Sequence, residues 1–252
     1  MLRAFTGHVL GIEAVAARAD GRWAVSGSWD RTLKVWDLDT GAELRILSGH
    51  GDRVTGVAAA SDDLRAVSVS GDGTLKVWNL QSEAEPRTVG GLGVGVDALT
   101  VTPDGRRAVC GSWEGTLSVW DLDAATKLHT LAGHSDRVAG VAVAPDERRV
   151  VSASRDGTLK VWDLESRVEQ RSRDGHAGWV AAIAVTPNGR QAVSASYDRT
   201  LKVWNLESGV EVYTLVGHSD RVTDVAMVAD GRWVVSGSDD NTLKTWNLVF
   251  SP

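Results

Sequence analysis

The strongest constraint on this chain is an internal repeat of 42 residues. A Gly-His pair recurs at this interval in five of six copies, with no insertion or deletion between copies. The 252 residues therefore divide into six equal units, and a period of this length is typical of repeat arrays and propellers. One tryptophan of each copy recurs at the same interval: Trp36, Trp78, Trp120, Trp162, Trp204 and Trp246.

Every signal inside one copy favours β-structure. In the fourth copy, VAGVAVA (138–144) alternates small and β-branched residues, RVVSAS (149–154) follows a Pro-Asp turn, and TLKVWDL (158–164) follows Asp156-Gly157. A segment such as LRILSG (44–49) supplies a fourth short strand before the next Gly-His. Four strands per copy predict an all-β fold, a β-propeller of six four-stranded antiparallel blades.

The Gly-His pair, the Ser-x-Ser-x-Asp-x-Thr turn and the Trp-Asp or Trp-Asn ending resemble the WD-repeat family over essentially the whole chain. The resemblance implies a hydrogen-bonded structural tetrad of His, Ser, Asp and Trp in each blade. The third copy departs from the pattern, with Leu92, Cys110 and Glu114 replacing His, Ser and Asp and only Trp120 kept. The other five tetrads are His8, Ser26, Asp30, Trp36; His50, Ser68, Asp72, Trp78; His134, Ser152, Asp156, Trp162; His176, Ser194, Asp198, Trp204; and His218, Ser236, Asp240, Trp246.

These tetrads explain the polar residues that could otherwise suggest an enzyme. In each tetrad the Asp can accept from the His, which can bond the Ser, which can bond the Trp indole. An unpaired buried polar group costs about 1–3 kcal/mol, so the four residues satisfy one another. Five Ser-His-Asp sets in one chain do not fit a hydrolase, so we predict no catalytic residue and no enzymatic activity. Five of the six histidines belong to tetrads and His129 stands alone, so we also expect no metal and no cofactor.

The chain ends suggest how a propeller could close. LRAFTGH at the N-terminus matches LRILSGH (44–50), so we expect residues 2–6 to form the fourth strand of the sixth blade. The predicted result is a closed six-bladed ring forming one domain, residues 1–252. Two alternatives stay open, namely a ring completed by a blade from a partner and a fragment of a longer array.

Three positions that flank the tetrad loops vary from copy to copy. One position, before the turn acid, holds Trp29, Gly71, Trp113, Arg155, Tyr197 and Asp239. A second, three residues after the histidine position, holds Gly11, Arg53, Gly95, Arg137, Trp179 and Arg221. A third, two residues further on, holds Glu13, Thr55, Asp97, Ala139, Ala181 and Thr223. By resemblance to the WD-repeat family, these positions line the upper face, which is the usual docking surface.

Aromatic residues and arginines dominate the energetic hot spots of protein interfaces. We therefore predict that eight residues, called the upper-face residues below, bind a partner. The alternative is that each aromatic only packs over its neighbour. The upper-face residues are Trp29, Arg53, Trp113, Arg137, Arg155, Trp179, Tyr197 and Arg221.

Arginine forks suit carboxylates, so the predicted partner is a protein or peptide, with an acidic segment and an aromatic or apolar anchor. A net charge of −6 argues against nucleic acid. No apolar run reaches the roughly 20 residues of a membrane span. The single cysteine and the absence of a signal-peptide pattern predict a cytoplasmic protein, expected to be monomeric.

We therefore expect a non-enzymatic interaction scaffold. Two alternatives remain at this point: a sensor or regulatory propeller of a larger signalling protein, such as a nucleotide-hydrolysing switch or a kinase, and a consensus-like engineered repeat protein without a native ligand.

Overall fold

The computed structural model describes residues 4–18, 21–60, 65–82, 84–93 and 95–248, without the side chains of 171–174. The chain divides into two compact units. One contains Met1–Ser112 and Ser118–His129, and the other contains Trp113–Leu117 and Thr130–Pro252. The single domain over residues 1–252 stays a prediction.

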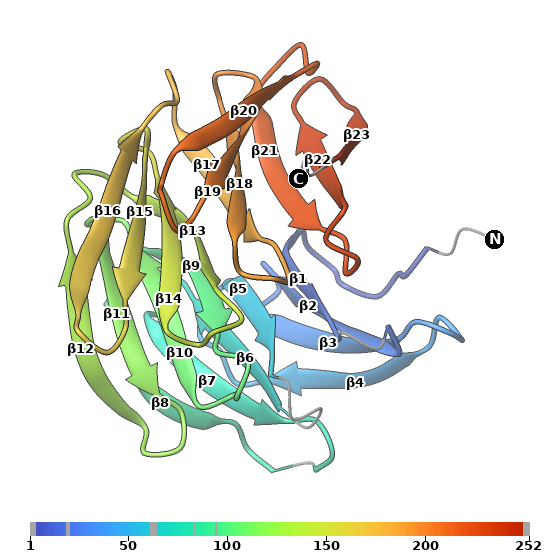
Figure 1. Cartoon of the computed structure of the whole chain (residues 1–252). Coiled ribbons are helices and arrows are strands. Elements are labelled where there is room, and N and C mark those ends of the chain that lie inside the picture. Colours follow the sequence, from blue (N-terminus) through green and yellow to red (C-terminus); the bar gives the residue numbers. More distant parts are fainter. Residues whose placement is uncertain (1–3, 19–20, 61–64, 83, 94, 249–252) are drawn as a thin grey trace. The chain divides into compact units, whose positions relative to one another are not determined.

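The described residues form six antiparallel sheets, one for each 42-residue copy, and contain no helix (Figure 1). This result confirms the all-β class and the six propeller blades. The first three blades are β1 (Ile12–Ala17), β2 (Trp23–Ser28), β3 (Thr32–Asp37), β4 (Glu43–Ser48); β5 (Val54–Ala59), β6 (Arg65–Ser70), β7 (Thr74–Asn79), β8 (Arg87–Gly91); and β9 (Val96–Val101), β10 (Arg107–Ser112), β11 (Thr116–Asp121), β12 (Thr126–Ala132).

The last three blades lie in the second half of the chain, coloured yellow to red in Figure 1. They are β13 (Val138–Val143), β14 (Arg149–Ser154), β15 (Thr158–Asp163), β16 (Val168–Asp174); β17 (Val180–Val185), β18 (Gln191–Ser196), β19 (Thr200–Asn205), β20 (Glu211–Val216); and β21 (Val222–Met227), β22 (Trp233–Ser238), β23 (Leu243–Asn247).

Apolar side chains fill the space between consecutive blades of one unit. Between blades four and five, Val151 and Leu159 pack with Val180, Ile183 and Trp204 in one buried cluster. Equivalent clusters lie between blades one and two, two and three, and five and six. The alternation of small and β-branched residues that predicted the first strand of each blade therefore serves close packing between sheets.

The turn after the second strand of each blade has the same backbone in all six copies. The residue that follows the turn acid has positive φ in every copy, from 63° to 83°. Glycine adopts this left-handed conformation at little cost, but Arg31, Arg199 and Asn241 also occupy it. The turn thus directs the acid back towards the blade even where no glycine is present. The residues at this position are Arg31, Gly73, Gly115, Gly157, Arg199 and Asn241.

The sixth sheet contains three strands among the described residues. Leu243 in its third strand is 76% exposed, whereas Leu201, one repeat earlier, is fully buried. Residues 2 and 3 of the predicted closing strand lie outside the described residues, and residues 4–6 are not in a strand. Phe5 instead packs edge-on against Trp36 of the first blade, with ring centroids 5.8 Å apart. Closure of a ring by residues 2–6 stays a prediction.

Candidate functional site

The structure brings together the four tetrad residues in blades one, two, four, five and six. The histidine Nδ1–H donates to the aspartate at 2.7–3.0 Å. The serine hydroxyl donates to histidine Nε2 at 2.7–2.8 Å. The tryptophan indole N–H donates to the same serine oxygen at 2.7–2.8 Å. Each chain of donors and acceptors therefore runs from the indole in the sheet to the aspartate in the turn.

A threonine completes each tetrad. In blade two, the Thr74 amide and hydroxyl both donate to Asp72 Oδ1, at 2.9 and 2.7 Å, while the Gly51 amide donates to Asp72 Oδ2. Burial by itself would raise the pKa of Asp72. The hydrogen bonds from Thr74, Gly51 and His50 outweigh it and lower the pKa to about 2. The aspartate is therefore ionised and fully engaged inside the blade.

The same geometry leaves no free nucleophile in the tetrads. Burial lowers the pKa of His50, His134 and His176, which keeps these rings neutral, although their aspartates act in the opposite direction. A neutral ring has one donor and one acceptor, as the chain of hydrogen bonds requires. The five tetrad serines are buried and already hold both an indole donor and an imidazole acceptor. The arrangement stabilises the blade and offers no route to acyl transfer.

Blade three replaces the tetrad with a different hydrogen bond. The Trp120 indole donates to the Ser118 hydroxyl at 2.9 Å, and Ser118 stands where the other five blades have lysine. Cys110 fills the place of the tetrad serine. It lies within an apolar cluster that includes Ala108, Leu122 and Trp120. Burial raises the pKa of the Cys110 thiol to about 12. Sequence reasoning identified the lost tetrad but missed Ser118 as the new acceptor.

The last strand of blade two, which contacts Trp120 of blade three, also departs from the 42-residue register. In blade one Thr32 pairs with Ser48, but one repeat later Thr74 pairs with Gly91 instead of Gly90. The shift is a bulge in β8, and it brings Gly90 against the Trp120 ring, where a side chain would clash. In the other blades that contact belongs to the glycine of the Gly-His pair, as with Gly133 and Trp162. A position assigned by counting repeats is therefore displaced by one residue in space.

The upper-face residues occur as pairs that join neighbouring blades. In each pair an arginine guanidinium lies over an aromatic ring, which is a cation–π contact. One pair lies in the first unit and three lie in the second. The distances from guanidinium carbon to ring centroid are 5.3 Å for Arg53 and Trp29, 4.9 Å for Arg137 and Trp113, 4.4 Å for Arg155 and Trp179, and 5.1 Å for Arg221 and Tyr197.

A spacing of 24 residues underlies these pairs. The residue before the turn acid in one blade faces the residue three after the histidine position in the next blade. Four of the five such pairs combine one aromatic with one arginine, and the fifth, Gly71 with Gly95, has neither. The order is reversed at Arg155 and Trp179, where the arginine comes first. The sequence contains this spacing, but only the structure shows that residues 24 apart face each other across neighbouring blades.

Each upper-face aromatic thus has a packing partner and still faces solvent. Trp29, Trp113 and Trp179 are 44–50% exposed. Backbone hydrogen bonds hold the two positions together in blades one, two, four, five and six, for example from the Tyr197 amide to the Trp179 carbonyl at 2.9 Å. In blade one the Trp29 indole also donates to the Glu13 carboxylate. Packing and exposure therefore coexist, so the contacts do not remove these rings from a partner's reach.

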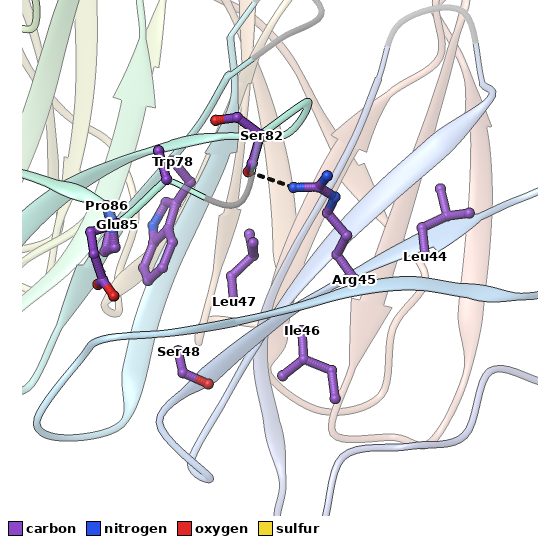
Figure 2. Close-up of a pocket in the computed structure, with 10 residues that line it drawn as sticks. Leu44, Arg45, Ile46, Leu47, Ser48, Trp78, Ser82, Glu85 and Pro86 are labelled. Carbon is purple, nitrogen blue, oxygen red and sulfur yellow. Dashed lines mark hydrogen bonds between the residues drawn. The ribbon is translucent and has the colours of Figure 1, made fainter.

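A hollow of about 420 Å³ lies elsewhere on the first unit, between β4 and the segment that follows β7 (Figure 2). Figure 2 shows Arg45 reaching the Ser82 carbonyl, a hydrogen bond of 2.5 Å, while Trp78 and Pro86 lie beside each other. Its lining mixes polar and apolar groups, and Leu44 and Ile46 are half exposed. Its side chains do not form a group of convergent polar residues, so we base the candidate site on the upper face.

Among the described residues, no cluster of three or more His, Cys, Asp or Glu residues is arranged to hold a metal ion. In the same part of the chain there is no helix with the length and apolar character needed to span a membrane.

Comparison with known proteins identifies similar chains. The family described as IFT122 first beta-propeller matches residues 1–247. Small ribosomal subunit protein RACK1 is 51% identical over 39 residues in Candida albicans, covering 16% of this chain and 12% of the relative. The Caenorhabditis elegans protein of that name is 46% identical over 44 residues, covering 18% and 14%. Cross-pathway control WD-repeat protein 2 of Flammulina velutipes is 49% identical over 43 residues, covering 17% and 14%.

Each of these three matches has about the length of one repeat. The matched segment spans only 12–14% of the length of the curated relatives.

Proposed function

Because the chain belongs to the WD-repeat β-propeller family, to which its match with the IFT122 first beta-propeller over residues 1–247 assigns it, we propose that it is a protein-interaction scaffold. In this proposal the upper-face residues bind a protein or peptide partner, and the tetrads hold the blades that present them. Propellers of this family generally bind proteins or peptides and are generally non-enzymatic. We extend both properties to this chain and place it in the cytoplasm.

The observation that carries the proposal is the set of exposed aromatic rings held by arginines. Large rings in a partly exposed position bury much area on binding. The arginine stacked over each ring limits its rotamers before any partner arrives, so less side-chain entropy is lost on association. These residues are thus prepared for an interface, and a purely structural contact would not require Trp29, Trp113 and Trp179 to stay about half exposed.

The charge of the upper face supports an acidic partner. A cation–π contact occupies the flat face of a guanidinium and leaves its in-plane N–H donors available to carboxylates. Arg155 makes no side-chain hydrogen bond or ion pair with any residue that the structure describes. An acidic segment with an aromatic or apolar anchor fits both the arginines and the rings.

The test is affinity capture from source-cell lysate with three forms of the chain. The first is the wild type, and the second carries Trp29→Ala, Arg155→Ala, Trp179→Ala and Tyr197→Ala. The third, a matched control, carries Trp233→Ala and Arg190→Ala, which remove an exposed tryptophan and an exposed arginine away from the upper face.

We expect the wild type and the control to capture the same partner and the upper-face variant to lose it. Circular dichroism and the unfolding midpoint would verify that all three forms are folded. Equal capture by the three forms, or capture by none, would contradict the proposal.

A further inference from the structure

Blades four and five differ from the other blades in the residues at two upper-face positions, the one three residues after the histidine position and the one before the turn acid. Blade four is the only blade with arginine at both positions, Arg137 and Arg155, joined by a backbone hydrogen bond of 2.9 Å. Blade five is the only blade with aromatics at both, Trp179 and Tyr197, whose ring centroids lie 5.4 Å apart. The Arg155 guanidinium of blade four lies over the Trp179 ring of blade five, while Arg137 lies over Trp113 of blade three and Arg221 of blade six lies over Tyr197. No other two neighbouring blades combine two arginines with two aromatics at these positions.

These residues surround a pocket of about 160 Å³ in the second unit. Arg137, Arg155, Trp179 and Tyr197 form its walls, together with Thr223 of blade six. No aspartate or glutamate lines the pocket. The Arg155 guanidinium lies 4.4 Å from the centroid of the Trp179 ring, and no carboxylate of the described residues neutralises it. The pocket is therefore positively charged on one side, aromatic on the other, and open to solvent.

In blade one, a carboxylate of the chain itself contacts the upper-face tryptophan. There Glu13 accepts a hydrogen bond from the Trp29 indole. The same repeat position is Ala139 in blade four and Ala181 in blade five, and both alanines line the pocket. The two blades that carry the arginine pair and the aromatic pair thus lack the internal acid, and the alanines leave its space open.

We infer that this pocket binds a carboxylate side chain from a partner protein. The inference rests on the proposed function and specifies the chemistry of its recognition site. The incoming aspartate or glutamate presents its carboxylate to Arg155, with Arg137 in the wall of the same pocket, and its aliphatic stem packs against the rings of Trp179 and Tyr197. The carboxylate takes the place that Glu13 occupies at blade one.

The chemistry of the groups supports this assignment. An arginine stacked through its flat face keeps a fork of in-plane N–H donors, and the spacing of that fork matches the two oxygens of a carboxylate. Stacking also reduces the hydration of the guanidinium, which strengthens its attraction for an anion. A neutral amide of the same shape offers only one acceptor oxygen and no charge, so the pocket discriminates against it.

The test uses three acetylated and amidated tetrapeptides, Gly-X-Leu-Gly, with glutamate, glutamine or phosphoserine at X. Binding is followed in the whole chain at low salt by NMR, through the Arg155 Nε–H and Trp179 Nε1–H signals. We expect the glutamate peptide to shift both signals and to bind at least tenfold more tightly than the glutamine peptide. Similar binding of the two peptides would overturn the inference, as would binding of the phosphoserine peptide alone.

Two variants and a control sharpen the result. Ala181→Glu places a carboxylate of the chain itself in the pocket. It is expected to lower the affinity for the glutamate peptide at least tenfold. Arg155→Ala is expected to do the same, whereas Arg190→Ala, an exposed arginine in a turn of blade five, leaves the affinity unchanged. The hydrogen-bonded Trp204 indole signal reports that each variant is folded. Undiminished binding by a folded Ala181→Glu chain would contradict the inference.

Affinity capture with Ala181→Glu separates this inference from the proposed function. A partner captured by the wild type and lost by Ala181→Glu supports both. If Ala181→Glu retains the partner but the variant with four upper-face substitutions loses it, the scaffold function is supported and the carboxylate pocket is overturned. Peptide binding without any captured partner supports the pocket and contradicts the scaffold.

Discussion

Blades three and four come from consecutive copies of the repeat but hold the tryptophan that recurs in every copy by different means. In blade four the Trp162 indole bonds Ser152, which continues through His134 to Asp156. In blade three the Trp120 indole bonds only Ser118, and apolar residues fill the remaining space. The comparison shows that the blade requires a partner for the indole N–H and does not require the tetrad. Losing three tetrad members together avoids leaving one of them buried without a partner.

The largest expected effect is the slow reaction of the Cys110 thiol in blade three. Because burial raises the pKa of Cys110 to about 12, little thiolate exists at pH 8, and the sulfur is also inaccessible. We expect the native chain to react with a disulfide reagent at least about a thousandfold more slowly than the chain in guanidinium chloride. The measurement is the rate of thiol release in both conditions. A native rate within tenfold of the unfolded rate would show that blade three opens readily.

Truncation at one repeat position tests the comparison directly. Ser152→Ala leaves a buried indole N–H and an imidazole nitrogen without partners, so we expect a loss of about 2–4 kcal/mol in the free energy of unfolding. Cys110→Ala, the equivalent change in blade three, removes a buried sulfur and its weak hydrogen bond with Ser118, which keeps the Trp120 indole as a partner, so it is expected to cost about 1 kcal/mol. Urea unfolding followed by tryptophan fluorescence measures both. Equal costs would mean that the tetrad contributes nothing beyond packing.

The replacement acceptor in blade three gives a smaller effect. Ser118→Ala removes the partner of the Trp120 indole and is expected to cost about 1–2 kcal/mol. The matched change in blade four, Lys160→Ala, breaks a part-buried ion pair with Glu169 at 2.9 Å, but the Glu169 carboxylate stays partly exposed to water, so the expected cost is about 1 kcal/mol. The same urea experiment compares them. If Lys160→Ala were the more damaging variant, Ser118 would not be the functional substitute for the tetrad serine.

The pH dependence of stability is expected to be the smallest effect and to come from the tetrad blades. The pKa values of His50, His134 and His176 lie below 6.5 in the folded chain, so below that pH the unfolded chain binds more protons. Their stabilisation is complete above pH 6.5 and decreases as the pH falls. Asp72 adds a second loss between pH 3.8 and about 2.

Urea midpoints at pH 7.5, 6.5 and 5.5 would measure this dependence, and a midpoint that rises on acidification would contradict it. The Ser118→Ala variant provides a control, because neither Trp120 nor Ser118 titrates in this range. Its midpoints should fall with the same slope as those of the wild type.

Much of this structure could be predicted from residue patterns. The alternation in VAGVAVA and the turn at Asp156-Gly157 indicated strands and turns that the structure contains. These are local signals, because side chains alternate across a strand and few residues tolerate positive φ. The conformation of the residue after the turn acid was less predictable, since Arg31 and Arg199 adopt it without being glycine.

The bulge in β8 could not be predicted by counting. The repeat places Gly91 opposite Trp120 by analogy with Gly133 and Trp162, yet Gly90 makes the contact. The run of glycines around residue 91 weakens the strand register, and packing against the Trp120 ring then selects it. A register choice of this kind depends on contacts between blades and not on the residues of β8 alone.

The sequence by itself determined the number of blades, the strand content and the membership of the tetrads, because each depends on residue types at a constant spacing of 42. Only the tertiary structure decided which arginine stacks on which ring, that Ser118 replaces the tetrad serine, and that Ala181 opens a pocket beside Trp179. These features depend on contacts between different strands or blades, so they follow from distance in space and not from position in the repeat.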